Sequence, residues 1–219
     1  MSISKRLLHI AKYIDGYDSL ADIACDHGYL GIYALEKYNI NDVLLTDINE
    51  LPLQCAMENA KRKKIDNKIT FKLGDGLRPL DKDYEVISIA GIGGILMIKI
   101  LEDCIGRAQN AKRLILCPNT DSYAVRKFLD ENGFEIELEE IVHDFKYYEI
   151  IVAKYNGLCN KYNQKELKYG PILLKNKCIE FVDYYTNKCN MFKEQLNKIN
   201  DMCSKAKIIN EIKEIESII

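Results

Sequence analysis

Hydrophobic and polar positions follow a repeating order along the first two thirds of the chain. Short apolar runs predict five buried strands, and the amphipathic stretches around them predict helices. The strands are expected at residues 20–24, 43–46, 69–73, 86–90 and 114–117, and the helices at 4–14, 29–38, 52–64, 95–104 and 122–132. Strands that alternate with helices in this way predict a mostly parallel sheet covered by helices on both faces.

Two further strands are expected after this alternation, at residues 134–142 and 147–154. Only four residues separate them, so they can pair as an antiparallel hairpin. The hairpin would then form an antiparallel edge of the sheet. The pattern predicts a doubly wound, Rossmann-like α/β domain, an arrangement shared by methyltransferases and dehydrogenases.

The last quarter of the chain has a different periodicity, in which apolar residues recur at alternating steps of four and three. Such steps form the seam of a heptad repeat. The seam consists of Cys178, Val182, Tyr185, Cys189, Phe192, Leu196, Ile199 and Cys203, and a second, out of phase, of Ile208, Ile212, Ile215 and Ile219. We expect a helical hairpin of the coiled-coil type that turns near residues 204–207, with a single bent helix as the alternative. Two domains are therefore expected, at 1–156 and 157–219.

Composition narrows the class of protein. Hydrophobic residues make up 47% of the 219 positions, enough for a packed core. No apolar run approaches the roughly 18 residues that span a membrane, and the N-terminus lacks the features of a signal peptide. The eight cysteines form no CxxC pair and the three histidines are scattered. We expect reduced thiols, no metal site and a cytoplasmic protein without membrane contact.

Charge is spread unevenly along the chain. Residues 1–154 contain 20 basic and 25 acidic side chains, whereas residues 155–219 contain 11 lysines and 8 acids. This asymmetry allows a polyanionic partner without requiring one.

Polar residues and glycines follow each of the five expected strands. In an open α/β sheet, ligands bind beyond the carboxyl ends of the strands. The candidates in chain order are Asp22, Asp26, His27 and Gly28, then Asp47, then Gly74, Asp75 and Gly76, then Ala90, Gly91, Gly93 and Gly94, then Pro118 and Asn119. Taken singly, each acid also fits a helix cap or a turn. Their recurrence at successive strand ends favours one common site.

The loop after the first strand discriminates between cofactors. A dinucleotide requires GxGxxG, but this loop has one glycine and two carboxylates, Asp22 and Asp26. These would repel a pyrophosphate, and they suit the amino group and sulfonium of S-adenosylmethionine. Asp47, 19 residues beyond Gly28, lies near the offset at which an acid accepts from ribose hydroxyls. Asp75 is placed to accept from the exocyclic amine of the cofactor's adenine.

The glycines after the fourth strand allow two interpretations. They let a flat substrate lie against bare backbone, or Gly94 merely lets a helix pack closely on the sheet.

Together these residues resemble the bacterial tRNA (adenine-N1)-methyltransferases that act on position 22. The resemblance covers essentially the whole chain. It rests on SKRL (Ser4–Leu7), ADIACDHGYL (Ala21–Leu30), GDGL (Gly74–Leu77), AGIGG (Ala90–Gly94), CPN (Cys117–Asn119), YYEIIVA (Tyr147–Ala153) and GPILLKNK (Gly170–Lys177). The chain departs from the family where Ala24-Cys25 replaces the usual Gly-Ser and where Cys117 replaces the usual Gln. If the replaced glycine has a positive φ, Ala24 strains the loop.

The resemblance implies a class I methyltransferase fold, S-adenosylmethionine as cofactor and tRNA as partner. It implies a cofactor site made of Arg6, Asp22, Cys25, Asp26, His27, Gly28, Asp47, Ile48, Gly74, Asp75, Gly76 and Ala90. The target base would contact Gly91, Gly93, Pro118 and Asn119, and the catalytic residues would be Asp26, Tyr29 and Asn119. We expect a monomer. The alternatives are a class I methyltransferase acting on another RNA or a small molecule, and a non-catalytic RNA-binding adaptor of the same fold.

Overall fold

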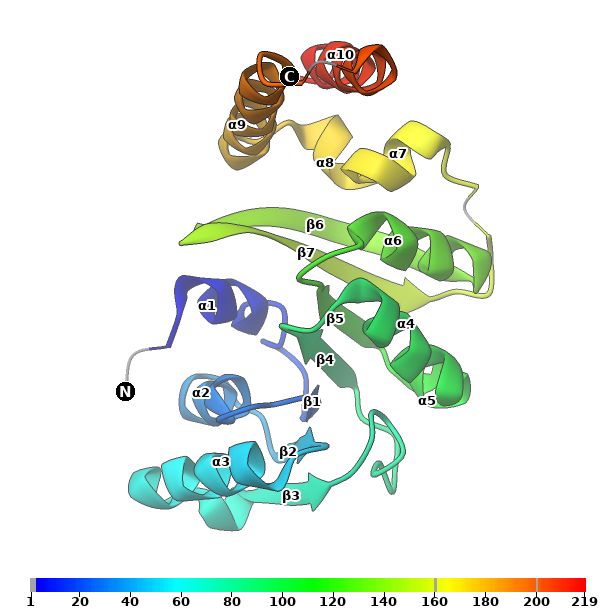
Figure 1. Ribbon diagram of the computed structural model, residues 1–219. Coiled ribbons are helices and arrows are strands. Elements are labelled where there is room, and N and C mark those ends of the chain that lie inside the picture. Colours follow the sequence, from blue (N-terminus) through cyan, green and yellow to red (C-terminus); the bar gives the residue numbers. More distant parts are fainter. Residues whose placement is uncertain (1–2, 160, 200) are drawn as a thin grey trace.

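The computed structural model describes residues 3–159, 161–199 and 201–219 (Figure 1). A seven-stranded sheet with the order β3-β2-β1-β4-β5-β7-β6 crosses the molecule. Its strands are β1 (Ser19–Ile23), β2 (Asp42–Asp47), β3 (Ile69–Leu73), β4 (Val86–Ala90), β5 (Arg113–Cys117), β6 (Phe134–Asp144) and β7 (Lys146–Tyr155). The first five are parallel, and β7 runs antiparallel to both β5 and β6. The expected α/β sheet with an antiparallel edge is therefore confirmed.

Helices cover both faces of the parallel strands (Figure 1). One face packs against α1 (Lys5–Ala11), α2 (Tyr29–Lys37) and α3 (Glu50–Lys63), and the other against α4 (Gly94–Asp103), α5 (Ile105–Asn110) and α6 (Ser122–Glu131). A short 3₁₀ turn, η1 (Asp66–Lys68), precedes β3. In β2, Leu44 points into one core and Val43 and Leu45 into the other. Strands buried on both faces need continuous apolar runs, which explains why the sequence pattern located them.

The C-terminal part consists of α7 (Gln164–Tyr169), α8 (Pro171–Asn176), α9 (Ile179–Leu196) and α10 (Met202–Glu216). The last two form the expected helical hairpin, and α8 and α9 pack on β6. A third core, which includes Ile141 of β6 and Phe181 of α9, joins this part to the sheet. The short helices α5, α7 and α8 are not among the elements that the sequence pattern predicts, because each spans only six residues.

The predicted position of the helical turn is wrong. Residues 204–207 lie inside α10, and the chain turns before Asp201, whose carboxylate accepts the backbone N–H of Ser204 at 2.7 Å. This N-cap starts a new helix and resets the heptad register. Cys203 is therefore exposed. Ile219 is also exposed, and Ile218 is buried in its place.

The hairpin turn also differs from the expectation. Strand β6 continues to Asp144 and β7 begins at Lys146, so Phe145 alone separates the two strands instead of four residues. Among the described residues, no helix is both long and apolar enough to cross a membrane.

A buried ion network lies between α6, the hairpin and the C-terminal helices. The Arg126 guanidinium donates to Glu139 at 2.6 Å and to Glu149 at 2.5 Å, and both Arg126 and Glu139 are fully buried. Glu139 also accepts the backbone N–H of Ile172 in α8 at 2.9 Å. The network therefore ties the C-terminal helices to the outer strands.

Candidate functional site

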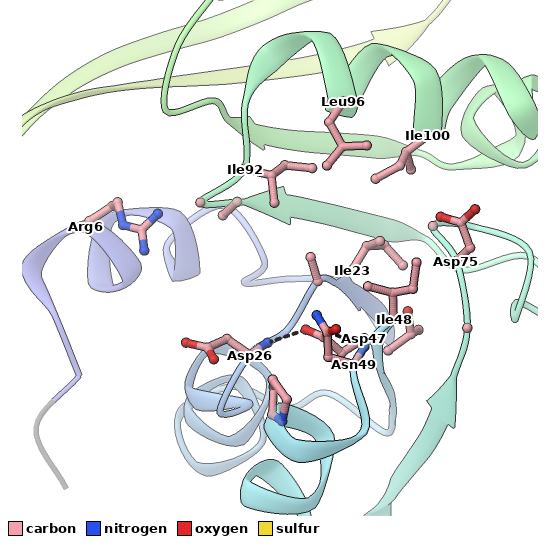
Figure 2. A pocket seen from close by; sticks show the side chains of 17 residues that line it. Arg6, Ile23, Asp26, Asp47, Ile48, Asn49, Asp75, Ile92, Leu96 and Ile100 are labelled. Atoms are coloured by element: carbon pink, nitrogen blue, oxygen red, sulfur yellow. Dashed lines mark hydrogen bonds between the residues drawn. The ribbon is translucent and has the colours of Figure 1, made fainter.

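A cavity of about 430 Å³ opens at the carboxyl ends of the parallel strands (Figure 2). Its walls come from the loops after β1, β2, β3 and β4, from Leu96 and Ile100 of α4, and from Arg6 of α1. A smaller chamber of about 60 Å³ adjoins it and includes Asp22 and Tyr29. Arg6, Ala24, Asp26 and Ala90 line both spaces, so the two form one continuous site.

Asp47 joins the first two loops of the cavity. Its buried carboxylate accepts the backbone N–H of Asp26 at 3.2 Å and that of Asn49 at 2.9 Å (Figure 2). The carboxylate therefore stands at the end of β2 with its position set by two backbone donors. Its remaining lone pairs face a cavity wide enough for a sugar, which suits a pair of vicinal hydroxyls.

The loop after β1 has an unusual backbone, because Ala24, Asp26 and Gly28 all have positive φ, at 55°, 52° and 70°. A Cβ atom at Gly28 would lie 2.7 Å from Leu45, so glycine is required there for packing as well as for φ. The left-handed Ala24 carries strain that a glycine would not. The expectation that the Ala24 replacement strains this loop is therefore confirmed.

Asp22 is buried in the smaller chamber. Burial, with a smaller contribution from the nearby Asp47 carboxylate, raises the pKa of its carboxyl to about 7, although the backbone N–H of Gly31 and the Arg6 guanidinium act to lower it. The chamber therefore holds a carboxyl group that changes its charge near neutral pH. A cationic ligand group would stabilise the charged form.

Arg6 connects α1 to both spaces. Its backbone N–H donates to Asp144 at 2.9 Å, and its guanidinium lies 4.9 Å from the centre of the Tyr148 ring. The Nη1 atom is buried and has no hydrogen-bond partner among the described residues. A buried, unpartnered donor of this kind fits an anionic or carbonyl group of a ligand.

The far end of the cavity is apolar. Ile48 of the β2 loop and Leu96 and Ile100 of α4 line it, and Asp75 stands at its rim (Figure 2). Asp75 forms an ion pair with Arg78 at 3.2 Å. An apolar slot with one acceptor at the edge suits a flat heteroaromatic ring that carries an amine.

The loops after β4 and β5 are joined by hydrogen bonds. The Asn119 side chain donates to the Gly91 carbonyl at 2.5 Å, and the Asn119 backbone N–H donates to the Ile92 carbonyl at 2.8 Å. Gly91 lines the cavity with a φ of 86°. A Cβ atom at Gly94 would lie 2.6 Å from the Thr120 carbonyl oxygen, so Gly94 serves close packing. The close-packing interpretation therefore applies to Gly94, and contact of a flat substrate with Gly91 stays a prediction.

Most of the expected site residues lie together. Arg6, Asp26, Asp47, Ile48, Gly74, Asp75, Gly76, Ala90 and Gly91 line the large cavity, and Asp22, Cys25, His27 and Tyr29 line the chamber. Gly28 and Gly93 line neither space, and Pro118 and Asn119 line a separate groove beside α9. The sequence pattern did not identify Asn49 and Pro52, although both follow Asp47 closely.

Cys117 does not face the cavity. Its side chain is fully buried in the core, and burial raises the pKa of its thiol to about 11. Cys117 therefore lies in the core next to Arg6 and does not itself line the cavity.

The fold and the acid-lined site at its strand ends define a class I methyltransferase. The chain belongs to the tRNA (adenine(22)-N(1))-methyltransferase family, whose sequence profile matches residues 20–219. The tRNA (adenine(22)-N(1))-methyltransferase of Bacillus subtilis is 31% identical over 193 residues, which cover 85% of this chain and 81% of the relative.

Solved structures agree with this assignment. A Streptococcus pneumoniae protein in complex with S-adenosyl-L-methionine has a TM-score of 0.89 and 30% identity, with 99% of both chains covered. TrmK of M. capricolum in complex with S-adenosyl-homocysteine has a TM-score of 0.84 and 26% identity, and the match covers 99% of this chain and 97% of that one.

Proposed function

We propose that this protein transfers the methyl group of S-adenosylmethionine to N1 of adenine 22 in tRNA. The observation that carries the proposal is the row of acids at successive strand ends, Asp22, Asp47 and Asp75, in a chain of this family. The apolar slot beside Ile48, the Asp47 carboxylate and the chamber that holds Asp22 follow one another along the site. The adenine, the ribose and the amino-acid part of the cofactor follow one another in the same order.

The residues fit S-adenosylmethionine group by group. Asp22 would accept from the amino group, and the free Nη1 of Arg6 would donate to the carboxylate. Asp47 would accept from the ribose hydroxyls, and the slot beside Ile48 would hold the adenine, with Asp75 accepting from its amine. When bound, the cofactor supplies an electrophilic methyl group on a sulfonium.

The protein's task in this reaction is alignment. Adenine N1 has an in-plane lone pair, so it needs no general base before it attacks the methyl carbon. The N1–C bond forms as the C–S bond breaks, and the electron pair of that bond stays on sulfur. Holding the two reactants in line can supply roughly 7–11 kcal/mol. The base becomes cationic, and the exposed Asp26 carboxylate beside the chamber would stabilise that charge.

Asn119 would select the base. Its amide nitrogen is engaged by the Gly91 carbonyl, which leaves its Oδ1 atom as an acceptor. Adenine presents an amine beside N1, where guanine presents a carbonyl oxygen. A fixed acceptor therefore favours adenine. Tyr29, whose ring centre lies 5.6 Å from that of His27, would form the neighbouring wall.

Binding of tRNA would rely on local basic surface, because the chain has a net charge of −2. The candidates are Lys5, Arg6, Lys12, Lys161, Lys165, Lys168, Lys175, Lys177 and Lys188. Arg6 and Lys168 are the weakest of these, because the Arg6 guanidinium lines the cofactor cavity and Lys168 already pairs with Glu211 at 2.9 Å and Glu214 at 2.8 Å. If the others neutralise phosphates, affinity falls steeply with salt.

We also propose that residues 1–156 bind the cofactor and residues 157–219 form a tRNA-binding domain. The apolar seam of α9 and α10 is buried within the chain, which supports a monomer. A protein that modifies tRNA and has reduced thiols belongs in the cytoplasm.

The test incubates the purified protein with labelled S-adenosylmethionine and unmodified tRNA transcripts, followed by nuclease digestion and mass spectrometry. A transcript with guanine at position 22 is the control. We expect N1-methyladenine at position 22, and none in the control. Cofactor binding without label in any tRNA would favour another substrate or the non-catalytic adaptor.

A further inference from the structure

The β6–β7 hairpin projects well past the rest of the sheet (Figure 1). Strand β7 pairs with β5 only from Ile151 to Ala153, and Ile151 lies opposite Leu116 near the carboxyl end of β5. The preceding residues of β7 continue beyond that end, paired with β6 alone. At about 3.3 Å per residue, the turn lies roughly 20 Å beyond Ile151. We call residues 140–150 the arm. The arm extends beyond the carboxyl ends of the parallel strands, on the side of the sheet where the cavity opens.

The arm is braced from both sides. On one side, the Glu140 carboxylate lies 2.7 Å from Nδ1 of His9 and accepts the Tyr13 hydroxyl at 2.8 Å. On the other, the ring of Tyr147 lies 5.0 Å from that of Tyr184 in α9. Contacts with α1 and α9 therefore hold the tip of the arm in a defined position.

Phe145 forms the turn at the tip, and two features of it are unfavourable for the isolated protein. Its side chain is fully exposed, with a relative accessibility of 102%. Its φ is 62°, a left-handed conformation that bulky residues rarely adopt and that glycine or asparagine adopts more easily. An uncovered aromatic ring on a strained backbone turn indicates a function in contact with a partner.

The tip lies close to the chamber, and Arg6 spans the interval. The backbone N–H of Arg6 donates to Asp144, the chain neighbour of Phe145, while its guanidinium lines the chamber and the cavity. Exposed Lys146 follows Phe145 directly, and exposed Lys5 precedes Arg6, whose backbone is bonded to Asp144. An exposed ring among cations fits a partner that is both aromatic and anionic, as RNA is.

N1 of adenine lies on its pairing edge, so the target base must leave its stack before methylation. Proteins that distort nucleic acids often insert an apolar side chain between bases. We propose that Phe145 stacks on the tRNA base next to the extruded adenine and fills the gap that the adenine leaves. The inference rests on the proposed function, and it assigns the arm as the element that keeps the target base extruded.

The chain has no tryptophan, so Phe145→Trp introduces a single tryptophan at the tip, whose fluorescence can be excited selectively. We expect unmodified tRNA to quench this emission in the absence of cofactor. Asn67→Trp is the control, because Asn67 is also exposed but lies in η1, before the amino end of β3. Its emission should not change. Equal quenching in the two tryptophan variants would overturn the inference. So would emission of the Phe145→Trp protein that changes with protein concentration but not with added tRNA.

Activity provides the second measurement. Phe145→Ala should lower kcat/KM for tRNA at least about fivefold, the lower end of the range for loss of one base–aromatic stack, with unchanged cofactor affinity. Phe145→Gly should show the same loss while melting at a higher temperature, because glycine relieves the backbone strain. Asn67→Ala, at an exposed residue outside the proposed cofactor and tRNA sites, should match the wild type. Wild-type kcat/KM in both Phe145 variants would refute the role. Tip quenching by tRNA, with a wild-type protein that methylates no tRNA, would instead refute the proposed function alone.

Discussion

The side chain of Asn119 is bonded to the Gly91 carbonyl across the loops after β5 and β4, with 2.5 Å between nitrogen and oxygen. This contact orients the amide so that its oxygen remains an acceptor. Asn119→Asp would place a carboxylate against the Gly91 carbonyl and lose the bond. A lost bond and an unsatisfied carbonyl cost about 1–3 kcal/mol, so we expect a roughly 5- to 150-fold lower single-turnover rate. The affinity of the Asn119→Asp variant for S-adenosylmethionine should not change. The control variant Thr120→Val, at the next residue, should react at nearly the wild-type rate.

Asp26 tests the electrostatic part of the mechanism. Asp26→Ala should abolish methyl transfer and leave the fold intact by circular dichroism. Because Asp26 has a φ of 52°, alanine also adds strain, whereas Asp26→Asn removes the charge and tolerates that backbone. We expect Asp26→Asn to be roughly 100-fold slower, as for loss of a group that stabilises developing charge. Near-normal turnover in both variants would remove Asp26 from the mechanism.

Ala24 offers a gain of stability. Replacing it with glycine relieves a left-handed conformation that costs an alanine roughly 1–2 kcal/mol, although glycine also gains entropy in the unfolded chain. We expect Ala24→Gly to raise the free energy of unfolding by about 1 kcal/mol in urea titrations. Ala21→Gly, at a buried β1 position, should lower it. An Ala24→Gly protein with a lower free energy of unfolding than the wild type would show that the backbone at Ala24 is not strained.

Asp22 predicts a pH dependence of cofactor binding. Its pKa is raised to about 7, so the carboxyl is protonated in the free protein at lower pH. A cationic amino group favours the carboxylate, and binding should therefore release a proton between about pH 5.5 and 7. Affinity should rise with pH across this window. Calorimetry in buffers of different ionisation enthalpy measures the release, and Asp22→Asn should eliminate it.

The raised pKa of Asp22 also makes the stability of the folded protein depend on pH. Between the ordinary carboxyl pKa of 3.8 and about 7, the folded state holds the Asp22 proton that the unfolded state has lost. Stability contributed by this group is therefore complete at low pH and declines as pH rises through that interval. Asp22→Asn should flatten the decline in urea midpoints, and an unchanged slope would argue against the raised pKa.

Arg126 predicts a structural effect far from the chemistry. Removing one member of a buried ion pair leaves an uncompensated charge and costs about 3–5 kcal/mol. Arg126→Met leaves the buried Glu139 in that state. We expect this loss in denaturant unfolding, whereas Lys127→Met, at an exposed neighbour with a 3.7 Å pair to Glu131, should be close to neutral. Equal losses of unfolding free energy in the two variants would show that the buried ion network adds nothing to stability.

Local signals in the sequence determined the strands and the acids at their ends. Central strands such as β4 are buried on both faces, so their apolar runs appear directly in the order of residues. Asp47 and Asp75 follow such runs, and parallel strands bring their ends to one edge whatever the details of packing. The sequence therefore predicted the common site before any contact was known.

Tertiary structure decided how these groups behave. The bond between Asn119 and Gly91, the contact of Arg6 with Asp144 across 138 positions, and the burial that raises the pKa of Asp22 all depend on packing between distant segments. The exposed tip at Phe145 likewise follows from how far β6 and β7 stay paired beyond the sheet. Periodicity records which face of an element is apolar, but the partner of that face and the surroundings of each polar group arise only when the chain closes on itself.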